Sequence, residues 1–258
     1  MKKQTILQLN QLNKDFYNKI SKEFSQTRSY YWNGWHKLSQ FLREELSQHT
    51  QPTILDLGCG NGRFAEFLQE ILNGKKFSYV GCDNSEKLLS IAQEKITLII
   101  DDAELKKLDL VKTTLDDSLQ EKLNHKRYHL ITLFGVMHHI PSADLRISLL
   151  QQLSHLLNHN GLIIFTAWQF QNDQRVFERQ SPPNKIGLDE SDLEAGDYIL
   201  DWRKGKVAYR YCHQTDHREL ENIIAQSNMD LVDQFYADGK TDQLNFYVIL
   251  RKKAVEDV

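Results

Sequence analysis

The stretch ILDLGCGNGRF, residues 54–64, constrains the fold of this chain most strongly. An apolar run ends near Asp56, and Gly58, Gly60 and Gly62 then turn the chain directly into a helical pattern. Glycines let a backbone approach a ligand closely, and the amino end of a helix favours an anionic group. The spacing lacks the third glycine of a dinucleotide-binding fingerprint, and a tight turn without any ligand is the alternative interpretation.

Short apolar runs alternate with helical patterns through the middle of the chain. The runs cover residues 53–58, 77–83, 128–135 and 161–168, and the helical patterns cover residues 62–72, 84–95 and 143–158. This alternation predicts an α/β fold, a doubly wound and mostly parallel sheet with helices on both faces. Two further runs, 229–238 and 243–252, are separated by a short turn and predict an antiparallel pair at the edge of the sheet.

Two segments lie outside this alternation. Apolar residues spaced by three or four positions predict two amphipathic helices within residues 1–51, which we interpret as an N-terminal helical cap on a domain of residues 52–258. Residues 171–206 are polar and contain Pro182-Pro183, so we expect a long mobile excursion there.

The composition is that of an ordinary globular protein. Of 258 residues, 40% are hydrophobic and 26% are charged, and a net charge of −3 gives no overall basicity that would indicate a nucleic acid. No apolar run is long enough to span a bilayer, and the first residues lack the pattern of a signal peptide. Three cysteines, an odd number, argue against a disulfide framework and favour the cytoplasm.

Acidic residues at two further places sharpen the interpretation of the glycine-rich turn. Asp83 closes the second apolar run, where a carboxylate can accept hydrogen bonds from both hydroxyls of a ribose. Asp116 follows a predicted third strand, within reach of an adenine amino group. Because the carboxyl ends of parallel strands meet at one edge of an open sheet, these residues together predict an adenosine site.

In these features the sequence resembles the class I S-adenosylmethionine-dependent methyltransferases, whose first motif matches residues 54–64 closely. The resemblance implies a seven-stranded, Rossmann-like sheet and S-adenosyl-L-methionine as the cofactor. Asp83 would then hold the ribose and Asp116 the adenine, with Asp101, Asp102 and Asp117 as alternatives for the adenine. The expected cofactor-binding residues are Asp56, Gly58, Cys59, Gly60, Asp83, Asn84, Asp116 and Phe134.

The segment ahead of the first strand narrows this resemblance. Tyr17-Asn18, the run from Phe24 to Arg28, Trp32 and the region 209–213 are similar to the tRNA methyltransferases that esterify 5-carboxymethyluridine at the wobble position. The resemblance implies tRNA as the substrate and a small zinc-binding activator protein as a partner. It suggests Arg28 and His138 as catalytic residues. The substrate-binding residues that we expect are Tyr31, Trp32, Trp168, Arg203, Arg210 and His213.

A carboxylate acceptor gives Arg28 a chemical purpose. The carboxylate is already ionised near neutral pH, with a reference pKa of about 4, so its methylation needs positioning and no general base. The guanidinium of Arg28 can grip it in a bidentate fork. It can equally hold the methionine carboxylate of the cofactor, or form a surface salt bridge.

Other interpretations stay open beside this one. A metal site built from histidines and Cys212 is conceivable, but without a CxxC or HExxH motif we expect no metal; the residues concerned are His138, His139, Cys212, His213 and His217. A methyltransferase acting on a small carboxylic or phenolic metabolite is the alternative enzyme. A non-catalytic cofactor-binding partner subunit is the alternative of another class, and the intact glycine-rich turn with Asp83 argues against it.

Overall fold

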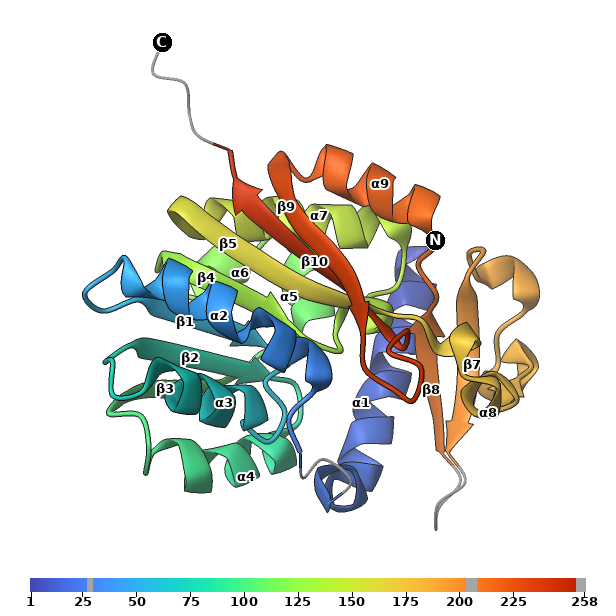
Figure 1. Ribbon diagram of the computed structural model, residues 1–258. Coiled ribbons are helices and arrows are strands. Elements are labelled where there is room, and N and C mark those ends of the chain that lie inside the picture. The colour runs from blue at the N-terminus through green and yellow to red at the C-terminus, as the bar shows by residue number, and fades with distance from the viewer. Residues whose placement is uncertain (27–29, 203–207, 254–258) are drawn as a thin grey trace.

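The computed structural model describes residues 1–26, 30–202 and 208–253, and Figure 1 shows a central twisted sheet between layers of helices. The seven strands lie in the order β3-β2-β1-β4-β5-β10-β9, and β10 pairs antiparallel with both of its neighbours. The strands are β1 (Thr53–Leu57), β2 (Ser78–Asp83), β3 (Asp102–Lys107), β4 (Tyr128–Leu133), β5 (Leu157–Trp168), β9 (Met229–Ala237) and β10 (Asn245–Lys252). The predicted seven-stranded, mostly parallel sheet with an antiparallel C-terminal pair is confirmed.

Helices cover both faces of this sheet. One face carries α2 (Asn33–Ser47), α3 (Arg63–Leu72) and α4 (Glu86–Ile96), and the other carries α5 (Leu110–Leu115), α6 (Leu119–Lys122), α7 (Ala143–His155) and α9 (His217–Gln226). Along β1, Ile54 belongs to the core on the α2 side, whereas Leu55 and Leu57 belong to the core on the α7 side. The continuous apolar run in β1 reflects burial on both faces of a parallel sheet.

The third strand lies earlier in the chain than the sequence suggested. β3 covers residues 102–107 and pairs in parallel with β2, and residues 110–115 form the helix α5. The side chain of Asp109 starts this helix by accepting a hydrogen bond from the backbone N–H of Lys112 at 3.2 Å. β3 is an edge strand with the sequence DAELKK, so its charged, half-exposed side chains give no apolar run to detect.

The segment predicted as a mobile excursion contains secondary structure of its own. Within it and just beyond it, β6 (Gln180–Ser181), β7 (Asp197–Trp202) and β8 (Ala208–His213) form a second, antiparallel sheet of three strands. The short elements η2 (Phe170–Asn172), α8 (Gln174–Phe177), η3 (Pro183–Ile186) and η4 (Glu190–Asp192) precede β7. The excursion predicted at residues 171–206 therefore has secondary structure in its described part, and its mobility stays a prediction.

The first helix, α1 (Lys3–Gln26), packs on this small sheet, as Figure 1 shows. Leu9 lies in one apolar cluster with Ile199 and Tyr211, and Phe16 lies in a second cluster with Ala208. The second N-terminal helix, α2, packs instead against α3 and β9. The two helices predicted as one cap therefore have different partners, and the domain boundary after residue 51 stays a prediction. Within the described residues, no helix is long and apolar enough to cross a membrane.

Candidate cofactor and substrate pocket

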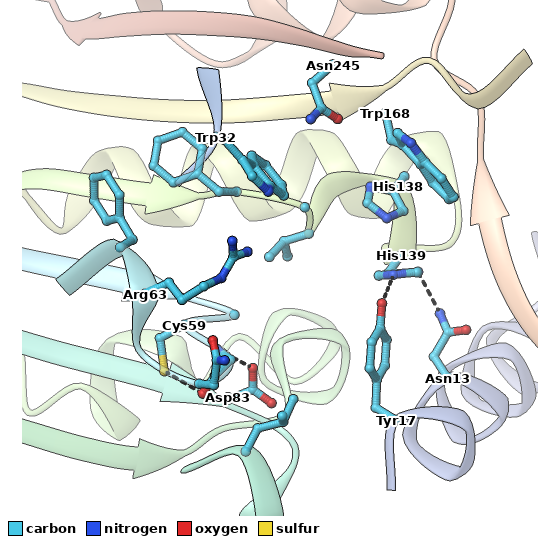
Figure 2. Close-up of a pocket in the computed structure, with 18 of the residues that line it drawn as sticks. Asn13, Tyr17, Trp32, Cys59, Arg63, Asp83, His138, His139, Trp168 and Asn245 are labelled. Carbon is cyan, nitrogen blue, oxygen red and sulfur yellow. Dashed lines mark hydrogen bonds between the residues drawn. The ribbon is translucent and has the colours of Figure 1, made fainter. Parts of the chain in front are cut away.

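A cavity of about 680 Å³ opens at the carboxyl ends of the parallel strands. Its wall comes from α1, the start of α2, the turns after β1, β2, β3 and β4, the end of β5, β8, and the turn between β9 and β10. Figure 2 shows Asp83 and Cys59 at one end of this pocket and Trp168, His138 and Asn245 at the other. We call these the Asp83 end and the Trp168 end.

The glycine-rich turn and Asp83 form the Asp83 end. Gly60 N–H donates to Asp83 Oδ2 at 2.9 Å, and Ser85 N–H donates to Oδ1 at 2.8 Å. Gly58 has a φ of +73°, and a Cβ there would lie 2.3 Å from Cγ2 of Val136, so the turn requires glycine at this position. Burial raises the pKa of Asp83, and the backbone N–H groups of Ser85 and Gly60 oppose that shift. A half-buried carboxylate that faces the cavity beside this turn suits the two hydroxyls of a ribose.

Asp56 is a buried residue of β1 that lines the cavity, and side chains of the two neighbouring strands hold its carboxylate. Tyr79 donates its hydroxyl to Asp56 Oδ2 and Thr132 donates its hydroxyl to Oδ1, each at 2.8 Å. Burial raises the pKa of Asp56 to about 6. Cys59, Asn84 and Phe134 line the cavity, as the predicted cofactor contacts require.

The predicted adenine contact through Asp116 is wrong in its placement. Asp116 follows the helix α5, and its carboxylate lies 3.7 Å from the ammonium group of Lys3, both well exposed. The alternatives Asp101, Asp102 and Asp117 also lie outside the cavity lining, the first two at the opposite, amino end of β3. The cavity wall after β3 consists of Leu108, Leu110 and Val111, which present apolar surface to a flat ring.

Aromatic rings and two arginines surround the remaining space (Figure 2). The indole of Trp32 stacks on Trp35 with centroids 5.3 Å apart, and the guanidinium of Arg63 lies 5.3 Å from the Trp35 ring and 5.9 Å from Trp32. At the Trp168 end, the guanidinium of Arg210 lies 4.8 Å from the Trp168 ring. Arginines held against indole faces are kept in place without losing their charge.

His139 is held in one neutral tautomer by its neighbours at the Trp168 end. Its Nδ1 lies 2.9 Å from the Tyr211 carbonyl oxygen, which can only accept, and 3.3 Å from Asn13 Nδ2, which can only donate. We assign the proton to Nδ1 because the contact with the carbonyl oxygen is the shorter one. Its Nε2 lies 2.7 Å from the hydroxyl of Tyr17, which therefore donates to it (Figure 2). Burial and the nearby Arg210 lower the pKa of His139 to about 3. The ring is thus neutral at physiological pH.

Three of the residues considered for a metal do lie together. The donor atoms of His138, His139 and Cys212 are all within 4.8 Å of one another. They suit a cation poorly, because both nitrogens of His139 are engaged with protein groups and Arg210 brings a positive charge nearby. Burial also raises the pKa of the Cys212 thiol to about 12, which opposes the thiolate that a metal would need.

The other predicted substrate residues divide into three groups. Trp32, Trp168, Arg210 and His138 line the cavity. Tyr31 and His213 do not, and their predicted substrate contacts are wrong in placement: the Tyr31 ring packs 5.2 Å from the ring of Phe67, and His213 is buried between Asp197, at 2.7 Å, and Glu219, at 2.6 Å. Arg28 and Arg203 lie outside the described residues.

Several pocket residues were not among the predicted site residues. Tyr17 and Asn13 reach the cavity from α1, Arg63 from the first turn of α3, and Asn245 from the first position of β10. Arg63 follows the glycine-rich turn directly, so its proximity to the ligand end of that turn was the one available indication.

Comparison with known proteins identifies the family. A family model described as "Methyltransferase domain" matches residues 25–234. The chain belongs to this family. The predicted S-adenosylmethionine-dependent methyltransferase class is thereby confirmed.

This methyltransferase is similar to several curated proteins. It is 23% identical over 246 residues to a "tRNA (carboxymethyluridine(34)-5-O)-methyltransferase" of Schizosaccharomyces pombe, which covers 92% of this chain and 94% of the relative. It is 24% identical over 159 residues, 62% of this chain, to the mouse "tRNA (carboxymethyluridine(34)-5-O)-methyltransferase ALKBH8", of which only 20% is covered. The chain therefore spans about a fifth of the length of the mouse protein. It spans 35% of the length of a second relative, "Probable tRNA methyltransferase 9B" of Bos taurus.

Solved structures share the fold. An S-adenosylmethionine-dependent methyltransferase from Clostridium acetobutylicum has a TM-score of 0.61 at 15% identity, covering 92% of this chain and 99% of that one. A second, from Methanosarcina mazei, has a TM-score of 0.59 at 15% identity, covering 79% of this chain and 93% of that one. At such identities the likeness extends to the fold alone.

Proposed function

We propose that this methyltransferase esterifies the carboxylate of 5-carboxymethyluridine at the wobble position of tRNA. The names of its relatives support this substrate, and the Schizosaccharomyces pombe protein corresponds over nearly its whole length. The observation that supports it most directly is a positively charged side chain at the Trp168 end of the pocket. Arg210 lines the cavity, and no carboxylate within residues 1–26, 30–202 and 208–253 forms an ion pair with it.

Arg210 suits a substrate carboxylate for a geometric reason. Its guanidinium is held against the Trp168 ring at 4.8 Å and the Phe16 ring at 5.2 Å, so the side chain is fixed by α1 and the end of β5. A planar guanidinium presents two parallel N–H donors that match the two oxygens of a carboxylate. Binding there would satisfy the charge of Arg210 and orient one carboxylate oxygen.

The pocket chemistry agrees with an acceptor that needs no base. The glycine-rich turn and Asp83 would hold S-adenosylmethionine, which would supply a methyl group to a carboxylate oxygen and leave as S-adenosylhomocysteine, with no proton to remove. The neutral His139, with Nδ1–H bonded to Tyr211 and Nε2 to Tyr17, is committed to protein groups on both sides. What remains for the protein is alignment and exclusion of water, which Trp32 and Trp168 provide as apolar walls.

Several finer assignments are part of this proposal. Arg28 holds either the substrate carboxylate or the methionine carboxylate of the cofactor, and His138 contacts the substrate. We expect a small zinc-binding activator protein as a partner and the cytoplasm as the location. The alternative is a methyltransferase for a small carboxylic metabolite, which the same Arg210 would serve.

The test combines cells and purified protein. Mass spectrometry of tRNA nucleosides from cells lacking this protein should show 5-carboxymethyluridine accumulating and its methyl ester disappearing. Purified protein, assayed with and without the activator, should then restore the ester on that tRNA. Unchanged nucleosides, together with no transfer to tRNA under either condition, would reject the tRNA substrate and favour the metabolite enzyme.

A further inference from the structure

Asn245 lines the pocket but has no role in the proposed binding of the cofactor or of the substrate carboxylate. It begins β10, pairs with Trp168 across the β5–β10 ladder, and lines the cavity although its side chain is only 4% exposed. Figure 2 shows it at the Trp168 end, on the side lined by Trp32. A buried polar side chain at this position must satisfy both halves of its amide.

The carboxylate of Asp238 fixes the orientation of that amide. Asp238 is 6% exposed; its Oδ1 accepts from Gly34 N–H at 2.9 Å, and its Oδ2 accepts from Asn245 Nδ2 at 2.8 Å and the Tyr247 hydroxyl at 2.7 Å. Burial and the charge of Asp238 raise the pKa of Tyr247 well above its ordinary value, so the phenol keeps and donates its proton. Asp238 therefore accepts from all three groups.

An amide side chain normally offers a binding pocket either a donor or an acceptor, because it can turn over. In Asn245 the turned orientation would set its carbonyl oxygen against a carboxylate oxygen, two acceptors facing each other. The NH2 group must therefore face Asp238, and Oδ1 remains as an acceptor. No group within the described part of the chain donates a hydrogen bond to Oδ1, so a ligand or water must do so.

We propose that Asn245 Oδ1 determines base specificity by accepting a hydrogen bond from the ring N–H of a pyrimidine. The inference rests on the proposed tRNA substrate and names the chemistry by which its base is recognised. Uracil carries a hydrogen on N3, whereas cytosine presents a bare nitrogen acceptor there. The fixed acceptor thus favours uracil and disfavours cytosine, and Asp238 is the positioning residue that fixes it.

Binding to a short anticodon stem–loop tests this inference without requiring turnover. Three RNAs would be compared by calorimetry in the presence of S-adenosylhomocysteine, carrying 5-carboxymethyluridine, its N3-methyl derivative or 5-carboxymethylcytidine. The wild type should bind the first at least about tenfold more tightly than either other, because an unsatisfied buried acceptor is costly. Asn245→Ala should reduce both ratios to less than about threefold. Asn158→Ala, at the far end of β5, is the matched control and should leave them unchanged.

Asp238→Asn gives an independent second variant that preserves the shape of the site. An asparagine at 238 can still accept from Gly34 N–H, but its own NH2 group would face residue 245 and turn that amide over. The uridine preference should then shrink and binding of the cytidine RNA should improve. Equal binding of uridine and cytidine RNAs by the wild type, or ratios that neither variant changes, would overturn the inference. Absence of methyl ester on tRNA would reject the proposed function separately, whatever the binding ratios.

Discussion

The two ends of the pocket are built in different ways. At the Asp83 end, residues 56–62 and 83–85 belong to two consecutive strand–turn–helix units, and backbone N–H groups make the key contacts with Asp83. At the Trp168 end, Trp32, Trp168, Arg210 and Asn245 come from four segments distant in sequence, and side chains make the contacts. The first end follows from local chain geometry, and the second exists only once the fold has assembled.

The largest expected effect is on the Asp83 end. Asp83→Ala should weaken S-adenosylmethionine binding by about 1.5–3 kcal/mol, the scale of hydrogen bonds to a charged group. Calorimetry measures the change, and the matched control Asp101→Ala removes an exposed carboxylate at the opposite end of the sheet. Unchanged affinity in Asp83→Ala would show that the ribose site is misplaced and that the local motif does not define this end.

A second change isolates the Trp168 end. Arg210→Lys keeps the positive charge but loses the planar fork and the contact with the Trp168 ring. Methyl transfer to tRNA should fall by about tenfold, equivalent to about 1.4 kcal/mol of transition-state stabilisation. Cofactor affinity should stay as in the wild type. A loss of cofactor affinity instead would mean that Arg210 holds the methionine carboxylate, and the two ends would not be separable.

The same contrast explains what the sequence could predict. Asp56, Gly58 and Asp83 were predictable because the residues that create their geometry are their immediate neighbours in the chain. Asp116 was misplaced because an edge strand has no apolar run, and because residues 110–115 are apolar enough to be taken for a strand although the Asp109 cap makes them a helix. Here local hydrogen bonding outweighed the apparent pattern.

The Trp168 end was predictable only in part. The family resemblance indicated Trp32, Trp168 and Arg210 but not what fixes them. Asn245 was missed because its orientation depends on a hydrogen bond to Asp238. Asp238 in turn accepts a hydrogen bond from Gly34, which lies 204 residues earlier in the chain. His213 was taken for a cleft residue because the sequence does not show that its two ring nitrogens face the carboxylates of Asp197 and Glu219.

A third prediction tests the docking of the small sheet that carries Arg210. Burial lowers the pKa of His213, but hydrogen bonds to Asp197 and Glu219 outweigh it and raise the pKa above its ordinary value. The stabilisation from His213 is thus fully present below the unfolded-state pKa of about 6.5 and is lost as pH rises through the folded-state pKa. As pH rises above about 6.5 and through the folded-state pKa, the wild type should lose more unfolding free energy than His213→Gln.

Hydrogen exchange localises this effect. After correction for the intrinsic pH dependence of exchange, protection of β8 amides should fall over that pH range while protection in β1 should not. Glu219 has the opposite pH dependence. Burial raises its pKa, but His213 and Arg146 lower it by more, so the stabilisation from Glu219 is lost as pH falls through its folded-state pKa. Equal pH dependence in wild type and His213→Gln would show that this network does not hold the small sheet in place.

The smallest expected effect concerns the mouth of the pocket. Lys240 lies in the exposed turn between β9 and β10, on the cavity rim together with Arg175. If a tRNA phosphate contacts Lys240, Lys240→Gln should reduce the slope of log affinity against log salt by about 0.7–0.9. Over about a fourfold range of salt concentration its affinity should therefore change about threefold less than that of the wild type. Filter binding of unmodified tRNA at several salt concentrations measures this slope.

Lys76→Gln makes the same charge change on a lysine paired with Asp101 at the amino end of the sheet, and should leave the slope unaltered. A slope that is flat in the wild type would instead favour a small metabolite with a single carboxylate, since such a ligand needs Arg210 but no cation at the rim.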